Sequence, residues 1–595
     1  MTDRKKKKES APQTRSEAAK EDQPVSRRSF LEGATGLGAA GLFLGSVVSA
    51  QQSKRTSAKL SSAGTQSLIP DDDDAKGPLG PQQRRSKARR VRRDAADLAY
   101  AVPVPNHQNN GDDDLYPDKI GSYSKGLPHN AFGEVDLAAY SAFCTALASG
   151  NPADYEAIPL GTPGGPGPAP GNTPIHKLID PQSGEAFELE GTDSHQLAQP
   201  PAPTFASAWE AGEIVENYWM ALLRDVPQRL YSTDPLAQAA LADLNAMSDF
   251  RGPKQGGLVT AQTLFRETFP GCTVGPYLSQ FFWLAQPFGA QDIDPRTHTA
   301  APGIDYMTTE ADYLDAQNGL SPANGNVPGG LVYSRNGRDL GQWVHIDVLF
   351  QGYFQALLTM ASLGVPANPG NPYNTSATQV GFGTFGGPYF AATMCEVASR
   401  ALRAVWYQKW QVHRRLRPEN FAAAVHFKAT GQRPAYPIHS DVLNSGALAQ
   451  VMSNNGTGFL PMAFPEGCPA HPAYGAGHAT VAGACVTILK ALFDTERLCT
   501  DFFAPVEATD DGSALMAYAG GDVGQMTIAG ELNKIGSNVA IGRNTAGVHW
   551  RTDGTESMLL GEQVAIGILR DQRLTYNEPF GGFTFTKFDG TVVTV

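Results

Sequence analysis

Hydrophobic residues recur at helical spacing through much of the chain. The segments 205–223, 348–363 and 390–410 repeat apolar positions every three or four residues. A further segment, 479–493, carries its large apolar residues on one stripe, as a helix packed in a core requires. The sequence shows no internal repeat and no alternation of strands with helices. This pattern predicts an all-α fold class.

Two long segments interrupt the helical pattern. Residues 158–174 and 300–340 are rich in Gly, Pro and Asn, which favour loops. The C-terminus differs, since apolar residues at 583–585 and 592–595 flank the pair Asp589-Gly590, a hairpin signal. The sequence therefore predicts long loops between the helices and a short C-terminal β-hairpin.

The N-terminus has the features of a bacterial export signal. The pair Arg27-Arg28 precedes Phe30-Leu31, and a Gly- and Ala-rich apolar stretch follows at 33–50. This order resembles a twin-arginine signal over residues 1–50 and predicts a periplasmic or extracellular protein. The alternative is a short membrane anchor, but the stretch is too short and too weakly apolar to span a bilayer comfortably. We expect no stable membrane association after signal removal.

Residues 51–93 have the composition of a disordered linker, rich in Ser, Gln, Pro and Gly. The last part, 84–93, is strongly basic and leads into a predicted helix at 94–101. It is either a solvated helix face or a contact to an acidic surface of the same chain or of a neighbouring subunit. Beyond the linker, we expect an N-terminal helical region, 94–385, and a catalytic helical-bundle region, 386–595.

Charge is distributed unevenly along the chain. The formal net charge is −12, but residues 1–93 hold 20 Lys and Arg against 10 Asp and Glu, so the remainder carries −22. A body that acidic argues against a nucleic-acid partner. Six cysteines in 595 residues are too few for a disulfide scaffold, and their pairing stays open.

Three segments of the last region carry residues suited to binding an oxyanion. In the first, Lys409 and Arg417 lie eight residues apart, about two helical turns, so both side chains can reach one pocket. Arg417 directly precedes Pro418, which tends to end a helix there. A cation at a helix end beside a loop suits anion capture. The alternative is a basic, solvated helix face.

The second segment, 471–480, combines glycines with histidines. Gly475 and Gly477 allow close backbone approach to a ligand. A helix is predicted to start just after them, and its free N–H groups suit phosphate-like anions. His478 at this edge can donate to an anion or act as general acid or base. The alternative is a Gly-rich turn with a capping histidine.

The third segment contains Arg543, His549 and Asp553. Arg543 offers a fork of donors to oxyanion oxygens. His549 is a candidate ligand or nucleophile. Asp553, one helical turn later, can orient the histidine ring by accepting its other N–H. The alternative is a His–Asp pair on a helix surface.

Together these motifs resemble those of the vanadium-dependent haloperoxidases, which share a superfamily with the type-2 phosphatidic acid phosphatases. The resemblance covers the chain from Lys409 onward, and residues 119–130 are similar to a segment of the larger bromoperoxidases. The eight-residue Lys–Arg spacing, and His471 placed seven residues before His478, resemble the bromoperoxidase branch. The family fold implies two four-helix bundles, with the cofactor at the end of one.

The resemblance implies how a vanadate cofactor would be held. His549 would be its axial ligand, and Asp553 would orient the His549 ring. Positive side chains would neutralise the oxygens of the anion, and a backbone N–H would add a further donor. These residues are Lys409, Arg417, Arg543 and, through its N–H, Gly477.

The resemblance also implies a reaction. His478 would act as acid and base toward hydrogen peroxide, Lys409 would polarise the bound peroxide, and His471 would tune the halide site. The expected activity is oxidation of halide, bromide favoured, to hypohalous acid that halogenates a small organic acceptor. Related enzymes are often homo-oligomers, so a homo-oligomer is expected here as well.

One position departs from the family pattern. The usual Pro-Ser-Gly-His reads Gly475-Ala476-Gly477-His478 in this chain. The missing serine hydroxyl would weaken vanadate binding by about tenfold or more, unless Tyr474 or water substitutes.

Two rival functions remain open at this stage. One is an acid phosphatase-type phosphomonoesterase with His549 as nucleophile, against which the Lys–Arg spacing and His471 weigh. The other is an exported oxyanion-binding protein without turnover, which Ala476 suggests.

Overall fold

The computed structural model describes residues 78–161, 177–320, 322 and 325–595. The predicted export signal, most of the predicted linker and most of the loop expected at 158–174 lie outside these residues. Helices dominate the described chain, and the prediction of an all-α fold class is confirmed. The α-helices are α2 (Pro81–Tyr100), α3 (Asp112–Leu115), α4 (Leu137–Ser149), α5 (Pro152–Glu156), α6 (Ala208–Leu222), α7 (Pro235–Ala246), α8 (Glu310–Gln317), α9 (Gly337–Ile346), α10 (Gln351–Leu363), α11 (Gly387–Tyr407), α12 (Pro418–Ala429), α13 (Ser440–Leu443), α14 (Gly446–Asn455), α15 (Gly477–Leu492), α16 (Ile528–Thr545) and α17 (Arg551–Arg573).

The described strands are short and form two-stranded antiparallel pairs. The last pair closes the predicted C-terminal hairpin, with Phe585 opposite Val593, so that prediction is confirmed. The strands are β1 (Gln286–Phe288), β2 (Gln291–Ile293), β3 (Thr297–Ala300), β4 (Pro328–Val332), β5 (Val506–Ala508), β6 (Leu515–Ala517), β7 (Thr584–Thr586) and β8 (Val592–Thr594).

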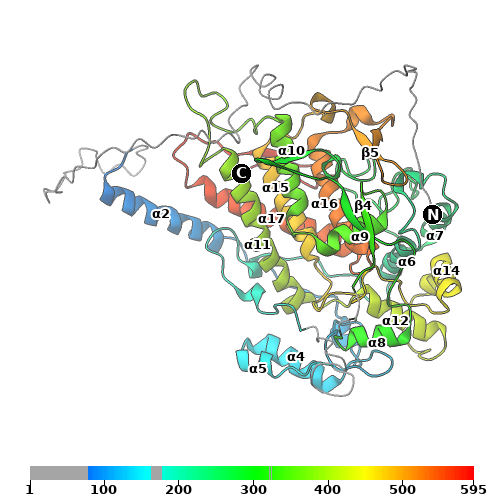
Figure 1. Ribbon diagram of the computed structural model, residues 1–595. Coiled ribbons are helices and arrows are strands. Elements are labelled where there is room, and N and C mark those ends of the chain that lie inside the picture. The colour runs from blue at the N-terminus through cyan, green and yellow to red at the C-terminus, as the bar shows by residue number, and fades with distance from the viewer. Residues whose placement is uncertain (1–77, 162–176, 321, 323–324) are drawn as a thin grey trace, which may run out of the picture.

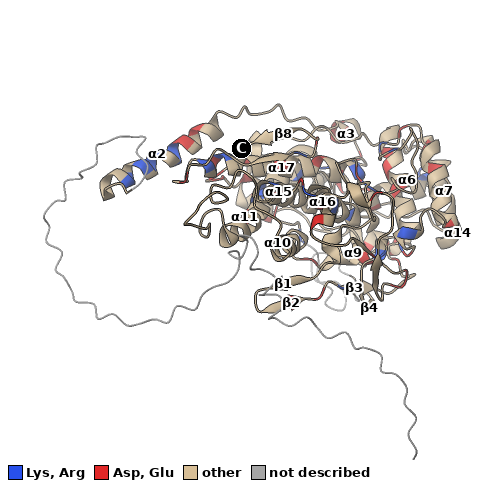
Figure 2. Ribbon diagram, turned by 90° about the horizontal axis from the view of Figure 1, so that it is seen from above, with Lys and Arg blue, Asp and Glu red and all other residues tan. Residues whose placement is uncertain are grey.

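Helix α15 is the centre of the helical core. It packs against α10, α11, α16 and α17, and Figures 1 and 2 show these helices side by side in the middle of the molecule. Every α15 residue except His478 is buried, so the helix is enclosed on all sides, as a central core helix must be. The grouping of the helices into two four-helix bundles stays a prediction.

Two glycines let α15 and α17 approach each other closely. A Cβ at Gly483 would overlap the backbone of Met558, and a Cβ at Gly561 would overlap the carbonyl of Thr480. Glycine lacks that atom, so the two helices can touch backbone to backbone. This contact fixes the start of α15, which carries His478, relative to the start of α17, which follows His549.

The periodic segments do form helices, namely α6, α10, α11 and α15. Their ends shift by a few residues because caps set them; the Ser207 side chain, for example, accepts the Glu210 N–H and starts α6 at Ala208. The segment 300–340 is more ordered than the loop predicted there. It contains α8 and β4, and β4 forms through pairing with β3, which no local pattern shows.

Helix α2 corrects the predicted linker. It begins at Pro81, so residues 81–93 are helical rather than irregular chain. Proline is well suited to the first helical position, and the Arg and Ala residues that follow favour helix. No α2 residue is buried, and the helix, whose first half is basic, extends away from the body in Figures 1 and 2.

Two further properties of the described residues concern localisation and redox state. None of the helices there has the length and apolar character needed to cross a membrane. All six cysteines are unpaired.

Candidate active site

Lys409 and Arg417 converge by a different route from the one predicted. They do not share a helix: α11 ends at Tyr407, a π-helical turn covers Gln408–His413, and Arg414 turns the chain with φ 46°. Arg417 is the N-cap residue of α12, and Pro418 begins that helix instead of ending one. The π turn and the chain reversal therefore bring both cations to one place.

Lys409, Arg417 and Arg543 are buried cations without an acidic partner. None of them lies within 4.0 Å of a carboxylate among the described residues, and all three are at most 7% exposed. Their donors are held by backbone carbonyls instead. Lys409 Nζ donates to Pro472 O at 2.7 Å and Ala473 O at 3.1 Å, Arg417 to His471 O at 2.9 Å and Val548 O at 2.6 Å, and Arg543 to Val344 O at 2.8 Å.

The local electrostatics show how strongly positive this site is. Burial, reinforced by Arg417, holds the pKa of Lys409 well below its usual range. Burial and the same Arg417 lower the pKa of Arg543 to about 10. The Nε atom of Arg543 is buried and has no hydrogen-bond partner among the described residues. A bound anion would complete the hydrogen bonds and offset the charge of this cluster.

His549 lies against the cationic cluster as a neutral imidazole. Its Nδ1 is 2.8 Å from Asp553 Oδ2, and its Nε2 is 3.0 Å from an Arg417 nitrogen. Burial and the cations around it hold the pKa of His549 well below its usual range. Because Nδ1–H donates to Asp553, Nε2 carries the lone pair that a metal centre requires.

Asp553 is itself held by Arg415. Asp553 Oδ1 lies 2.8 Å from an Arg415 nitrogen, and Glu210 and Glu213 complete the ion-pair cluster around that guanidinium. The charge of Asp553 is therefore neutralised on the side away from His549. Asp553 holds the His549 ring through Oδ2, and its carboxylate also attracts Lys409 and Arg417.

The start of α15 supplies a second set of polar groups. Gly477 is the first residue of the helix, so its N–H lacks an intrahelical acceptor. The next residue, His478, has its Nε2 3.0 Å from Asp347 Oδ1. Burial lowers the pKa of His478, although the Asp347 carboxylate opposes the shift. His478 is therefore neutral at pH 7 and able to accept a proton.

A cavity of about 410 Å³ brings most of these groups together. Its lining includes the polar residues Gly477, His478, Arg543 and His549 together with apolar side chains such as Trp406. His471 also lines it, 2.9 Å from an Arg417 nitrogen and with its ring centre 4.9 Å from that of Trp406. Lys409 and Arg417 lie behind this lining. The candidate residues from all three motifs are thus collected around one cavity.

The turn before α15 shows whether another side chain replaces the serine hydroxyl that is missing at Ala476. Tyr474 does not replace the missing serine at the cavity, because its hydroxyl donates to Pro200 O at 2.8 Å. Ser557 of α17 instead accepts the Ala476 N–H at 2.8 Å and the Gln199 side-chain N–H at 3.1 Å. This contact secures the turn from behind and provides no donor to an anion.

Sequence reasoning missed Asp347, Arg415 and Ser557. Each acts on a motif residue from a distant segment; Asp347 and His478, for example, are 131 residues apart. No local spacing identifies such partners. Arg415, two residues before Arg417, was a weak sequence signal for such partners. If its guanidinium is buried, it requires carboxylates from elsewhere in the chain.

Comparisons with known proteins show which proteins this chain resembles. A family model described as the VCPO second helical-bundle domain matches residues 389–576. A vanadium-dependent bromoperoxidase of Corallina pilulifera is 35% identical over 584 residues, covering 84% of this chain and 96% of that protein. One from Ascophyllum nodosum is 33% identical over 539 residues, covering 88% and 94%.

The similarity extends to three dimensions. The homohexameric structure of the second vanadate-dependent bromoperoxidase from Ascophyllum nodosum matches with a TM-score of 0.80 at 31% identity. The match covers 90% of this chain and 94% of that one. The likeness therefore extends well beyond the segment that the family model covers.

Replacing Ala476 by Ser tests the departure at the turn. We expect A476S to bind vanadate about tenfold more tightly, because a hydroxyl donor to a charged group contributes about 1.5–3 kcal/mol. Equilibrium titration with vanadate measures the change. Ala473→Ser, three residues earlier and also buried, is the control. Equal affinity of A476S and the unchanged protein would show that a hydroxyl at this position does not reach the anion.

Proposed function

The chain belongs to the vanadium-dependent haloperoxidase family, and from this we propose that it oxidises halide with hydrogen peroxide, using vanadate as cofactor. Bromide is the favoured halide, since the relatives that cover 84% and 88% of the chain are bromoperoxidases. The product, hypohalous acid, halogenates small organic acceptors. One observation carries this proposal: three buried cations, none with a carboxylate within 4.0 Å in the described part of the chain, surround the neutral His549.

The donor set fits vanadate. His549 Nε2 would be the ligand, and Lys409, Arg417 and Arg543 would offset the negative charge of the oxygens. The Gly477 N–H, free at the helix start, would donate to the same anion. When bound, vanadate supplies a Lewis-acidic vanadium(V) that activates peroxide without changing its own oxidation state.

His478 is placed to move the proton of hydrogen peroxide. With Nε2–H donated to Asp347, its Nδ1 carries the lone pair and accepts a proton from the incoming peroxide. The Asp347 carboxylate stabilises the imidazolium that results. The protonated His478 would then return this proton to the oxygen that peroxide displaces, which would depart as water.

Lys409 and His471 complete the proposed machinery. Two of the three Nζ–H groups of Lys409 are held by carbonyls, which leaves one to polarise peroxide oxygen as charge develops there. Burial holds the pKa of His471 well below its usual range, so this ring is neutral and adds no charge at the halide site that we assign to it.

We also propose export by a twin-arginine route to the periplasm or the outside. The support is in the sequence, namely Arg27-Arg28 and the apolar stretch that follows. A homo-oligomer is the proposed assembly. The relative from Ascophyllum nodosum is a homohexamer, and α2 presents an unburied basic face while residues 94–595 carry −22. We assign α2 to the contact with a neighbouring copy.

A bromination assay tests the proposed activity. Protein loaded with vanadate should brominate a phenolic dye in the presence of bromide and peroxide. His549→Ala should lose vanadate retention by at least about a hundredfold, along with bromination, because the ligand atom is gone. Metal analysis after dialysis measures retention, and His298→Ala, at an exposed histidine of β3, is the control.

Two outcomes would contradict this proposal. Hydrolysis of phosphate esters without vanadate, together with no bromination, would identify a phosphomonoesterase in which His549 is the nucleophile. Vanadate binding with neither reaction would identify an oxyanion-binding protein. Vanadate retained by His549→Ala would refute the ligand assignment.

Asp347→Asn tests the proton-transfer role of His478. Loss of the carboxylate removes the interaction that raises the pKa of His478, so that pKa should fall further. In the pH profile of kcat/KM for peroxide, the acid limb is the range in which the His478 base becomes protonated. This limb should move to lower pH. The plateau should fall about tenfold, since the weaker base no longer has a charged partner. The pH profile measures both effects.

Glu466→Gln is the matched control for that variant. Glu466 also lines the cavity, but its carboxylate bonds to His345 at 2.6 Å instead of to His478. The acid limb of the Glu466→Gln variant should lie at the same pH as that of the unchanged protein. An unchanged limb in Asp347→Asn would exclude His478 as the group that titrates.

Light scattering tests the assembly. The full mature chain should be an oligomer, and charge reversal at Arg84, Arg85 and Arg89 should reduce its mass because an attractive contact becomes repulsive. Lysine at the same three positions keeps the charge and should keep the mass. A monomeric parent chain, or an oligomer whose mass is unchanged by the charge reversal, would refute the role of α2.

A further inference from the structure

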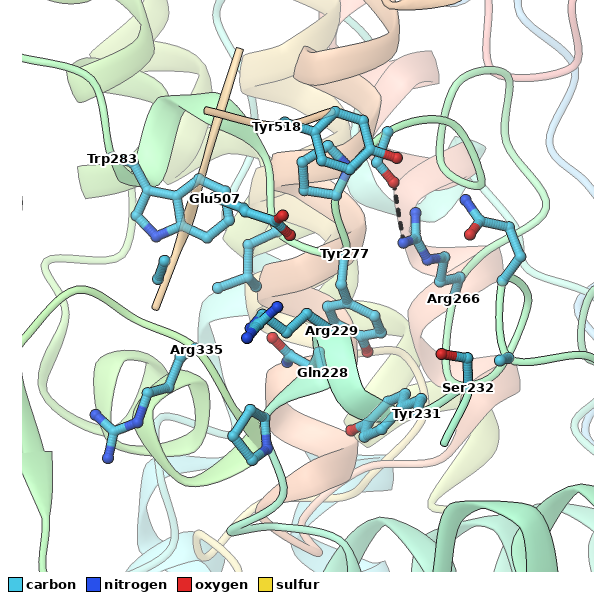
Figure 3. A pocket seen from close by; sticks show the side chains of 17 residues that line it. Gln228, Arg229, Tyr231, Ser232, Arg266, Tyr277, Trp283, Arg335, Glu507 and Tyr518 are labelled. Carbon is cyan, nitrogen blue, oxygen red and sulfur yellow. Dashed lines mark hydrogen bonds between the residues drawn. The ribbon is translucent and has the colours of Figure 1, made fainter. Parts of the chain in front are cut away.

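A second cavity, of about 290 Å³, shares no lining residue with the candidate active site. Figure 3 shows it between the turn at Gln228–Leu230, the segment around Tyr277 and the hairpin strand β5, which carries Glu507. None of its lining residues has a part in the proposed reaction. The cavity is therefore a separate feature of the molecule.

Arg266 is the unusual residue of this cavity. It is 6% exposed, and no carboxylate of the described chain lies within 4.0 Å of its guanidinium. It donates to Cys272 O at 3.0 Å and Gly275 O at 3.2 Å, and its Nε has no partner among the described residues. Burial lowers the pKa of Arg266. Apart from Arg417 and Arg543 of the candidate active site, the deeply buried arginines Arg224, Arg415 and Arg551 each have a carboxylate, whereas Arg266 has none within 4.0 Å in the described chain.

The two other guanidinium groups of the lining each have a carboxylate partner. Arg335 Nη1 lies 3.6 Å from Asp339 Oδ2, and Arg229 is paired with Asp510. Glu507 is the one carboxylate among the lining residues, and burial raises its pKa. Arg266 is therefore the guanidinium of this lining that has no carboxylate within 4.0 Å in the described chain, and it favours an anionic ligand.

Aromatic rings supply the remaining walls. Tyr231 and Tyr277 meet edge to face with ring centres 6.1 Å apart, and Trp283 and Tyr518 stand opposite in Figure 3. Tyr277 donates to Phe265 O and Trp283 to Ser334 O, so their polar atoms are already used. These residues present rings to the cavity. A volume at the low end of small-molecule sites, about 300 Å³, suits a ligand with one ring.

We propose that this cavity binds a small aromatic carboxylate. The carboxylate pairs with the guanidinium group of Arg266, and the ring packs among Tyr231, Tyr277 and Tyr518. An inorganic anion would satisfy the charge but leave the aromatic walls uncovered. The proposal goes beyond the haloperoxidase function and does not depend on it.

Calorimetric titration of the full mature protein tests this site with three probes: benzoate, benzamide and inorganic phosphate. Benzoate should bind one per chain, and benzamide, which has the same shape without the charge, at least about tenfold more weakly. Phosphate should also bind more weakly than benzoate at this site. Affinity for benzoate should be the same with and without vanadate.

Variants locate the binding. Ala261 lines the cavity and is only half-buried, so Ala261→Phe should fill the cavity and abolish benzoate binding while bromide oxidation persists. Ala239→Phe, at an exposed position of α7, is the matched control and should bind normally. Arg266→Gln should weaken benzoate binding about tenfold without affecting benzamide.

The proposal is overturned by any of four results. These are absence of benzoate binding, equal affinity for benzamide, unchanged binding in Ala261→Phe, or loss of benzoate on addition of vanadate, which would place the ligand in the candidate active site. Phosphate binding tighter than benzoate, and sensitive to Ala261→Phe, would identify an inorganic-anion site instead.

Discussion

Three positive side chains buried together without a carboxylate are the constraint on which the candidate active site depends. Each buried charge costs several kcal/mol of desolvation, about as much as one or two point mutations remove from a typical domain. Lys409, Arg417 and Arg543 also repel one another. Their hydrogen bonds in the described chain go to backbone carbonyls and, for Arg417, to the rings of His471 and His549, none of which carries a formal negative charge. A multiply charged oxyanion is the partner that offsets this cost, so the cofactor is part of the stability of the site.

Two residues before Arg417, Arg415 shows the opposite arrangement. It is also buried, but Glu210, Glu213 and Asp553 surround it with carboxylates. Asp553 connects the two environments, with one oxygen on Arg415 and the other on His549. The acidic cluster thus holds the His549 ring through one carboxylate, and Arg415 offsets part of the negative charge of the cluster.

The sequence predicted which residues come together at the candidate site better than it predicted the course of the backbone that brings them together. His549 and Asp553 were expected one helical turn apart on a helix, but His549 precedes α17. Asp553, third in that helix, reaches back to the Trp550 N–H and the His549 ring, as in a capping box. Periodicity located α15, and its glycines located the helix start beside the anion cradle. Local sequence patterns predict these features because residues that are close in sequence produce them.

Features that depend on distant segments were not predictable in this way. The π turn at Gln408–His413 and the reversal at Arg414 leave no composition signal, yet they decide where Lys409 points. Asp347 acts on His478 only through the packing of the loop after α9 against α15. The three guanidinium groups of the second cavity lie far apart in sequence, so its charge is visible only after folding.

The turn at Gly475 and Ala476 depends on a side chain 81 residues away. A Cβ at Gly475 would overlap Ser557 Oγ and the Gln199 amide, so proline, the residue usual in the family at this position, would require both side chains to move. Ser557 accepts the Ala476 N–H, and Gln199 donates to the same Ser557 oxygen. With alanine at 476, this segment offers an anion no side-chain hydroxyl, so the Gly477 N–H and the three cations are left as its donors.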